Sequence, residues 1–252
     1  MIQFLKSSDL SKGLLKDSMK ILSTFRPAFL PDLIYFWQMS QSQLIVFTDH
    51  LQFSKGTSIN RSAPLNTDQD VLSIPVKHDQ QKVTIAQKRM VPENFWRQKH
   101  LKTLHHLFHN FPFAEYYLPQ IEEIYKAEIY SLADFLFLLT DEIRCWLHLP
   151  VKIVRSGELN HDRDATALIL QWCLQFECQG YMAFAETFHK GWVQKDLLNQ
   201  QNIKVFQFPA LPSSHFLANY ANKSIIHFLL QFGPEAGYIL KQYSSARLQE
   251  VD

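Results

Sequence analysis

The chain is poor in glycine and carries almost no net charge. Seven glycines among 252 residues disfavour a dinucleotide fold with a glycine-lined phosphate turn, and neither GxGxxG nor GxxxxGK(S/T) occurs. Lys and Arg number 25 and Asp and Glu 24, so the net charge is +1 with His neutral. Because no basic excess is available to hold a phosphate backbone, the sequence predicts that nucleic acid is not a partner.

Cysteine is also scarce, and the thiols form no recognisable pattern. Cys145, Cys173 and Cys178 are odd in number, and the last two are not spaced as CxxC. We interpret them as free thiols in a reducing cytoplasm. The HExxH and GxSxG signatures are absent as well, so the sequence predicts neither a bound metal nor a serine-hydrolase nucleophile.

Long hydrophobic runs are missing too. The longest, Ser131 to Leu139, contains Asp134 and is far shorter than the roughly 20 residues that a bilayer-spanning helix needs. The apolar stretch from Met1 to Leu5 is too short for the hydrophobic region of a signal peptide. We therefore expect a soluble, cytoplasmic protein without a membrane span.

Apolar residues are nevertheless plentiful, and they are most clearly ordered in residues 19–65. The hydrophobic fraction of 46% is enough for a substantial core. Met19–Thr24 predicts a strand that two prolines end, 32–39 predicts a helix, and Leu44–Thr48 predicts a strand buried on both faces. Strand, helix and strand in this order form a βαβ unit, whose ligands bind beyond the carboxyl ends of the strands.

The rest of the chain alternates in the same way and predicts an α/β fold. We expect a mostly parallel, Rossmann-like sheet with flanking helices and an inserted helical block. The predicted division is an N-terminal extension with a short amphipathic helix (1–18), a first α/β half with a ligand loop (19–91), the helical insertion (92–149) and a second α/β half (150–252). Further strands are expected at 71–76, 83–85, 151–155, 181–184 and 203–208, and further helices at 92–109, 118–127, 132–147, 164–176, 192–200 and 224–232.

A polar cluster follows the second predicted strand: Asp49, His50, Gln52, Asn60 and Arg61. As a ligand pocket, it offers Arg61 for a phosphate or carboxylate held by two parallel hydrogen bonds. Asp49 would orient an amine or act as a base. The alternative is a loop that satisfies itself, with Asp49 as a cap, Arg61 in a salt bridge and Asn60 in a turn.

Two further polar groups stand in or after predicted elements. Lys99, with His100 beside it in the helix at 92–109, is a candidate phosphate contact, and a solvated lysine is the alternative. The histidines at 105, 106 and 109 include a pair at metal-ligand spacing, but without a third ligand we interpret them as exposed histidines. Ser156, beyond the strand at 151–155, is a candidate ligand contact.

Several stretches resemble the WbqC-like protein family. FRPAFLPDLIYFWQMSQSQLIVFTDHLQFSKGTSINR resembles the family opening, which reads H-Q-P-x-Y-L-P-W, an aromatic helix, and a strand leading into D-D-x-Q-F-x-K and N-R. FWRQKHLKTLHHLFHNFPFAEYYLP resembles its W-x-x-K-H block, and IVRSGEL, GYMAF and SIIHFLLQFGPE follow in the family's order. The resemblance extends from about Met19 to Gly237.

The resemblance implies a cytoplasmic protein associated with O-antigen and other surface-polysaccharide gene clusters. Such a protein would modify an activated amino sugar or a related small amine by N-acyl or aminoacyl transfer or ligation, with a nucleotide-linked or other small-molecule substrate. No cofactor is identified, and a protein partner in the same biosynthetic pathway is compatible with this role. Together with the residue patterns, the resemblance gives Asp49 and His100 as candidate catalytic residues. The candidate substrate contacts are Arg26, Gln52, Asn60, Arg61, Lys99 and Ser156.

The chain departs from the family at several polar positions. The family's histidine–glutamine pair is Phe25-Arg26 here, and the second acid of its acidic pair is His50. Phe25 cannot replace an acid, a base or a phosphate contact, whereas Arg26 can still bind an anion. The other departures are Asp32 for a tryptophan, Phe184-Ala185 for a glycine turn and His227 for an acid.

Two hypotheses therefore stay open. The first is a transferase or ligase in which Asp49, Arg61 and Lys99 converge on one hollow at the rim of the sheet. The second is a non-catalytic family member that has kept the fold as a small-molecule-binding or scaffold protein. Bulky aromatic side chains filling the space above Asp49 would favour the second.

Overall fold

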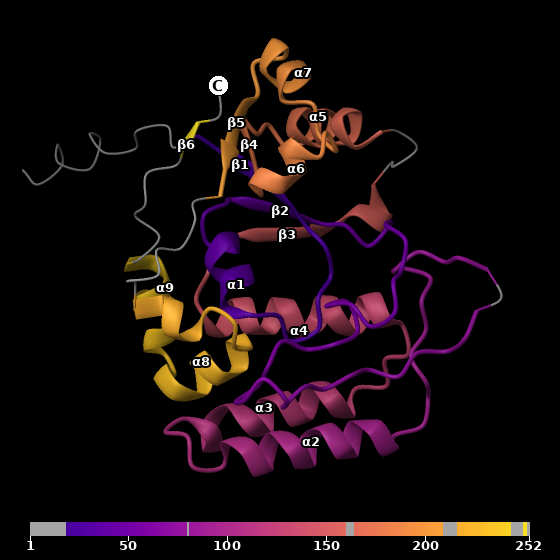
Figure 1. Ribbon diagram of the computed structural model, residues 1–252, viewed down its shortest axis with the longest axis vertical. Coiled ribbons are helices and arrows are strands. Elements are labelled where there is room, and N and C mark those ends of the chain that lie inside the picture. Colours follow the sequence, from indigo (N-terminus) through magenta and orange to yellow (C-terminus); the bar gives the residue numbers. More distant parts are fainter. Residues whose placement is uncertain (1–18, 80, 160–163, 209–215, 243–248, 251–252) are drawn as a thin grey trace, which may run out of the picture.

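The computed structural model describes residues 19–79, 81–159, 164–208, 216–242 and 249–250. The helix predicted in residues 1–18 lies outside these ranges. The described residues form a six-stranded sheet, flanked by helices, with the order β3-β2-β1-β4-β5-β6 (Figure 1). The strands are β1 (Ile21–Phe25), β2 (Leu44–Phe47), β3 (Lys152–Arg155), β4 (Gly180–Ala183), β5 (Lys204–Gln207) and β6 (Gln249–Glu250).

The order of the strands reverses at β1. The chain proceeds from β1 to β2 and β3 on one side, and then places β4 and β5 on the other. These five strands are parallel, and β6 is antiparallel to β5. In parallel sheets of this kind, ligands bind beyond the carboxyl ends of the strands where the order reverses. That point here lies after Phe25 and Ala183, and the predicted Rossmann-like α/β fold is confirmed.

Two hydrophobic clusters cover the two faces of the sheet. In β2, Leu44 and Val46 belong to one cluster, and Ile45 and Phe47 belong to the other. All four side chains are buried, because successive residues of a strand point to opposite faces and both faces here carry helices. The prediction that this strand is buried on both sides is correct.

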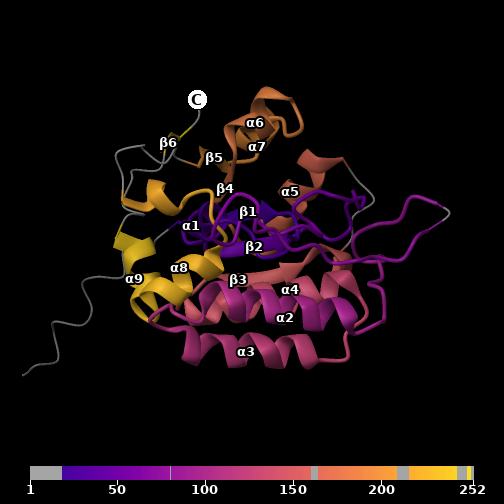
Figure 2. The same ribbon diagram turned by 60° about the horizontal axis from the view of Figure 1, so that its bottom comes forward.

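Nine helices occur within the described ranges. In one cluster, α5 and α7 pack on the sheet, and in the other α1, α4 and α8 do so. The pair α2 and α3 lies beyond α4, away from the sheet (Figures 1 and 2). The helices are α1 (Leu33–Met39), α2 (Phe95–Phe108), α3 (Ala114–Lys126), α4 (Leu132–Trp146), α5 (Ala165–Gln175), α6 (Ala185–His189), α7 (Lys195–Gln200), α8 (Ile225–Phe232) and α9 (Glu235–Gln242), with short 3₁₀ turns η1 (Ser156–Glu158) and η2 (Phe216–Tyr220).

Two aspartate side chains cap the helices that flank the carboxyl edge of the sheet. Asp32 accepts a hydrogen bond from the backbone N–H of Tyr35 at 3.0 Å and so caps α1. Asp164 accepts from the N–H groups of Thr166 and Ala167 and caps α5. Both caps satisfy N–H groups that have no partner inside the helix. They fix where α1 and α5 start beside the ends of the strands.

Two predicted strands are absent, and one predicted helix is shorter than expected. Residues 71–76 form isolated bridges, at Ser73 and Val76, and the predicted strand at 83–85 is a single bridge at Thr84. These segments lie in the long connection between β2 and α2, and they pair with other loops instead of the sheet. The helix predicted at 192–200 begins only at Lys195, and α9 after Gly233 was not predicted. In the described ranges, no helix combines the length and apolar character needed to cross a bilayer.

Candidate functional site

Two hollows adjoin at the carboxyl end of β1. One lies beside α1 and the loop at 56–64, has a volume of about 560 Å³, and is called the α1 hollow below. The other lies beside α5, has a volume of about 700 Å³, and is called the α5 hollow. Thr24, Arg26 and Phe184 line both of them. The pair therefore occupies the point between β1 and β4 at which a parallel sheet of this order binds its ligand.

The α1 hollow carries two guanidinium groups. Arg26 and Arg61 both line it and both are exposed. Within the described part of the chain, neither side chain forms an ion pair. Asp32 also lines this hollow, but its carboxylate caps α1, and burial raises the pKa of that carboxyl group. The arrangement is suited to an anion, because a guanidinium presents parallel N–H donors to phosphate or carboxylate oxygens.

The walls of the α5 hollow are largely aromatic. Trp172 comes from α5, Tyr181 from β4, and Trp192 from the turn before α7. His50 lies at the same hollow, and its ring meets the ring of Trp172 edge to face, with centroids 6.0 Å apart. An imidazole thus stands beside a cavity that is large enough for a small-molecule ligand.

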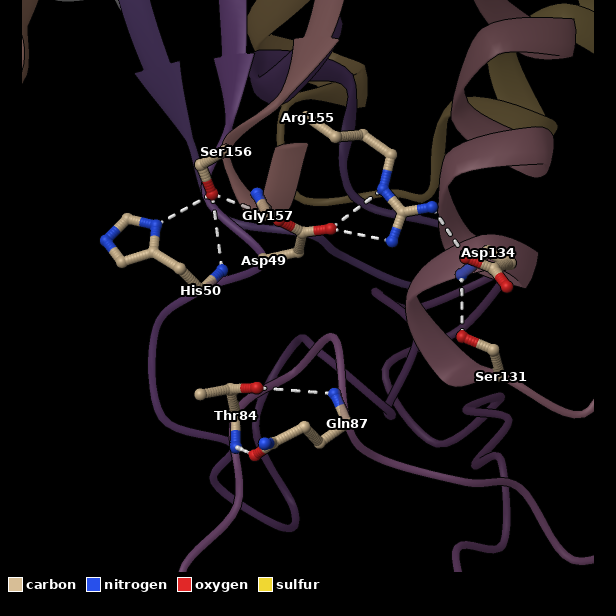
Figure 3. Close-up of polar contacts among 9 residues, drawn as sticks. All are labelled: Asp49, His50, Thr84, Gln87, Ser131, Asp134, Arg155, Ser156 and Gly157. Carbon is tan, nitrogen blue, oxygen red and sulfur yellow. Dashed lines mark hydrogen bonds and ion pairs between the residues drawn. The ribbon is translucent and has the colours of Figure 1, made fainter. Parts of the chain in front are cut away.

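Asp49 does not open onto either hollow, because its side chain is completely buried. One carboxylate oxygen accepts from the backbone N–H of Gly157 at 2.7 Å and from the hydroxyl of Ser156 at 3.0 Å (Figure 3). The other accepts from Nε and Nη2 of Arg155 at 2.8 and 2.7 Å, and Nη1 of Arg155 reaches Asp134 at 2.6 Å. A buried charge needs such pairing, so the carboxylate joins the ends of β2 and β3.

The hydroxyl of Ser156 connects this carboxylate to His50. Its oxygen lies 3.2 Å from the backbone N–H of His50 and 2.7 Å from ring atom Nδ1. The single hydroxyl proton is donated to Asp49, so Nδ1 must carry the proton of a neutral ring. Nε2 is then the basic nitrogen, and it lies on the side of the ring away from Ser156 (Figure 3). Ser156 is itself fully buried and serves to orient the imidazole.

Two of the predicted substrate contacts have other partners. The amide of Asn60 donates to the carbonyl of Ile74 at 3.0 Å and accepts from the N–H of Gly56 at 2.9 Å, and thereby holds the loop that presents Arg61. Gln52 is exposed and forms a bridge with Thr84, outside both hollows. Both residues shape the loop after β2.

His100 is part of the protein interior. Its Nε2 donates to the carbonyl of Ser73 at 3.2 Å, and its Nδ1 accepts from the hydroxyl of Tyr125 at 3.3 Å. The ring also stacks on Phe29. Burial lowers the pKa of His100 to about 4, although the bond to Ser73 opposes this shift and nearby Lys99 adds to it. A neutral, fully bonded imidazole therefore packs α2 against the rest of the protein.

The expected convergence of Asp49, Arg61 and Lys99 does not occur. Arg61 lines the α1 hollow, Asp49 is enclosed, and Lys99 lines a separate surface hollow formed by α2 alone. The physical reason is the position of α2, which packs beyond α4, away from the sheet (Figure 1). Lys99 is exposed on this helix. Sequence spacing could not reveal this, because it does not say on which layer a helix packs.

Other residues of the site were not predicted. Arg155 neutralises Asp49, and Trp172 and Trp192 form walls of the α5 hollow. A signal for Arg155 existed, since it ends the predicted strand at 151–155 and directly precedes Ser156. Trp172 gave no such signal, because an aromatic residue in an apolar helix normally belongs to the core. Trp192 gave none because it lies in the turn before α7, outside any recognisable motif. The described residues contain no cluster of His, Cys, Asp or Glu suited to a metal ion.

Comparison with known proteins gives one match. The model of the WbqC-like protein family matches residues 26–237. The chain belongs to the WbqC-like protein family. The matched range begins at Arg26 and includes His50, Arg61, Asp49 and Ser156, so both hollows lie almost wholly within the family region. The comparisons with curated proteins and with solved structures gave no match.

Proposed function

We propose that this WbqC-like protein is a transferase or ligase that modifies an activated amino sugar or a related small amine in the cytoplasm. The observation that carries the proposal is the position of Arg26 and Arg61 in one hollow, beside the hollow that holds His50. The arginines would bind the anionic activating group of the substrate. The same class of substrate is what the resemblance to the WbqC-like family implies, and the family match covers residues 26–237.

The proposed reaction is transfer of an acyl or aminoacyl group to an amine. The amine nitrogen attacks the carbonyl carbon of an acyl donor activated as an acyl phosphate or a thioester, and a C–N bond forms. The bond from that carbon to the phosphate or thiolate breaks, and the leaving group takes its electron pair. His50 Nε2 accepts the proton that the amine loses. Ser156 and Asp49 keep the imidazole in the required tautomer and orientation.

The competing hypothesis is a family member that binds ligand without chemistry. It draws on Phe25, which stands where the family has a histidine and is 2% exposed. Its ring packs edge to face against Tyr35 and Phe208, with centroids 4.9 and 5.9 Å away. That position has become part of the core. The space beside Arg26 is nevertheless open, which supports a functional ligand site.

Ligand binding tests the anion site first. Nucleotides, nucleotide sugars and acyl donors are screened by thermal shift, since a ligand at about 100 times its Kd should raise Tm by about 5–10 °C. Arg26→Ala and Arg61→Ala should abolish the shift, whereas Lys55→Ala, at an exposed lysine in the same loop, should retain it. A shift that survives both arginine variants, or no shift from any of these compounds, contradicts the proposal.

Turnover tests the role of His50. Once an active pair of substrates is found by mass spectrometry, His50→Gln should bind them as the wild type does but lower kcat by about 100-fold or more. His78→Gln, at an exposed histidine, is the matched control. Binding without turnover in the wild type would instead support the ligand-binding hypothesis.

A further inference from the structure

The α5 hollow has a polar wall and an apolar wall. The polar wall consists of residues in or shortly after β1 and β2, namely Thr24, Arg26, Thr48 and His50. Tyr181 of β4 adds a hydroxyl group, which forms a 2.9 Å hydrogen bond with the hydroxyl of Thr24. The groups that can polarise a carbonyl or take up a proton therefore lie at the carboxyl edge of the sheet.

One face of α5 forms the apolar wall. Ala165, Leu168, Ile169 and Trp172 line the hollow at intervals of three or four residues, which places them on the same side of the helix. The last three of these side chains are buried. A wall of aliphatic and aromatic carbon favours a hydrocarbon chain over a polar group, because the polar group would lose its hydrogen bonds to water.

Two exposed rings extend this apolar wall to the surface. Phe184 and Trp192 line the same hollow and are 44% and 59% exposed. The ammonium group of Lys190 lies 4.9 Å from the ring centroid of Trp192, within the range of a cation–π contact that holds the indole in place. A chain that leaves the hollow would cover both rings, so its affinity should rise with its length.

The charge of the hollow restricts what the chain carries. The described residues that line it include no Asp, Glu or Lys, and its permanently charged side chain is the cation Arg26. Asp49 is enclosed behind Ser156 and Gly157 and offers the hollow no carboxylate. An ammonium group placed there would lose water without gaining an anionic partner, and Arg26 would repel it. An aminoacyl group carries such an ammonium, whereas a simple acyl group does not.

We propose that the α5 hollow binds an uncharged, aliphatic acyl group, with its carbonyl at the polar wall and its chain along α5. The transferred group is then an acyl group and not an aminoacyl group. The inference rests on the proposed function for the role of His50 as the base, and it names the class of acyl donor.

This placement brings the two reactants together at His50. The amine substrate keeps its anionic group near Arg61 and reaches across the edge where Thr24 and Arg26 line both hollows. Its nitrogen attacks the carbonyl carbon in the α5 hollow, and His50 accepts the proton. The phosphate or thiolate of the donor leaves with the electron pair of the broken bond.

Isothermal titration calorimetry of the full chain tests the acyl site without turnover. The probes are acetate, butanoate, hexanoate and octanoate, with pyrophosphate for the anion site. Beyond acetate, the Kd should fall about threefold for each added methylene that the hollow buries. The compound 2-aminooctanoate has the chain of octanoate and one additional ammonium group. It should bind about tenfold more weakly than octanoate or worse, because that ammonium finds no carboxylate.

Variants locate the chain and its charge preference, and circular dichroism checks that each is folded. Trp192→Ala should reduce the gain in affinity from hexanoate to octanoate. Thr187→Asp places a carboxylate at the hollow, so it should weaken octanoate and strengthen 2-aminooctanoate. Thr103→Asp introduces the same charge on α2, outside both hollows, and should change neither affinity. Arg61→Ala should weaken pyrophosphate and leave octanoate unchanged.

The outcomes separate the acyl site from the proposed function. Equal affinities along the carboxylate series, or octanoate binding that neither Trp192→Ala nor Thr187→Asp alters, overturn the acyl site. Wild-type binding of 2-aminooctanoate as tight as that of octanoate assigns the hollow to an aminoacyl group and also overturns it. In each case, pyrophosphate binding that requires Arg61 leaves the proposed function standing.

Two further results bear on both proposals. Carboxylate binding that tightens with chain length, together with pyrophosphate binding that survives Arg26→Ala and Arg61→Ala, supports the acyl site and contradicts the anion site. Glucosamine binding that Trp192→Ala abolishes, without any effect of chain length among the carboxylates, assigns the aromatic wall to the sugar ring and overturns the acyl site. No binding of any probe overturns both.

Discussion

Asp49 shows how a single residue can be essential to a site without touching its ligand. It is enclosed by groups from β3 and η1, and its effect reaches the α5 hollow only through Ser156 and His50. A carboxylate after an apolar strand is a natural candidate for a catalytic base when only the sequence is considered. The structure gives it the different task of fixing an imidazole.

The first prediction concerns Asp49→Asn. This change leaves the Arg155 guanidinium, whose side chain is 20% exposed, with Asp134 as its remaining ion-pair partner among the described residues. Breaking a buried ion pair on one side costs about 3 kcal/mol of unfolding free energy, measured by urea denaturation. Asp134→Asn, at a carboxylate that is 50% exposed, is the control and should cost less than about 1 kcal/mol. Equal effects of the two changes would contradict the structure.

The second prediction concerns His100 and pH. Its pKa of about 4 in the folded protein is below the ordinary value of 6.5, so the unfolded chain binds a proton that the folded chain does not. This contribution to stability is complete above pH 6.5 and is lost as the pH falls toward 4, by about 3 kcal/mol in all. Urea denaturation between pH 7.5 and 4.5 measures the loss.

Replacing His100 separates its contribution to the pH dependence of stability from that of the carboxylates. His100→Gln removes the titrating group and should flatten the dependence of stability on pH between 6.5 and 4. His106→Gln, at an exposed position of the same helix, should retain the dependence of the wild type. An unchanged profile in His100→Gln would mean that the imidazole is not buried in neutral form.

Helix α9 packs closely against the end of α4 at Gly237. A Cβ atom at Gly237 would lie 1.8 Å from the carbonyl oxygen of Leu147, at the end of α4. We predict that Gly237→Ala lowers the free energy of unfolding by about 2 kcal/mol or more, because the helix must move away. Tyr238→Ala, at a neighbouring side chain that is 59% exposed, should change it by less. Equal thermal midpoints for wild type and Gly237→Ala would contradict this packing.

Helices and strands were predictable from the sequence where local residues alone determine them. Leu44–Phe47 was identifiable because four consecutive apolar residues suit a strand that is covered on both sides. The run at 71–76 is also largely apolar, although it contains Ser73 and Pro75, yet it forms only isolated bridges. Pairing requires a partner edge, and the sequence does not say which edge is available. The boundary between α8 and α9 falls at Gly233, whose φ of 56° ends the first helix.

The residues of the site were likewise predictable only where their positions follow from local sequence. The positions of Arg26, Asp49 and Ser156 just after strands follow from strand prediction, because the carboxyl ends of parallel strands share one edge. That Arg155 would neutralise Asp49, 106 residues earlier in the chain, depends on β3 being the neighbour of β2. The enclosed position of His100 depends on how α2 packs. Neither relation has a signature in local spacing.

At the scale of the whole molecule, the two hydrophobic clusters share one sheet. The clusters contain alternate residues of the same strands, so we expect them to unfold together. The thiols provide a test, because Cys173 and Cys178 are buried in the cluster beside α5, and burial raises the pKa of Cys173 to about 12. They should react only after unfolding.

The experiment uses Cys145→Ser, which removes the exposed thiol. The urea midpoint for thiol labelling should equal the midpoint for loss of helical circular dichroism, much of which comes from α2, α3 and α4 on the other face. A circular dichroism transition that precedes labelling would show that the helices unfold independently. The predicted insertion at 92–149 would then behave as a separate unit.

The connection between β2 and β3 has a consequence for the time course of folding. Asp49 and Gly157 meet although they are 108 residues apart, and a loop of that length is entropically costly to close before its contacts form. Pairing of β1 with β2 requires a much shorter closure. High contact order slows folding, so β3 should join the sheet late. The relay to His50 would then assemble only when β3 joins β2, after β1 and β2 have already paired.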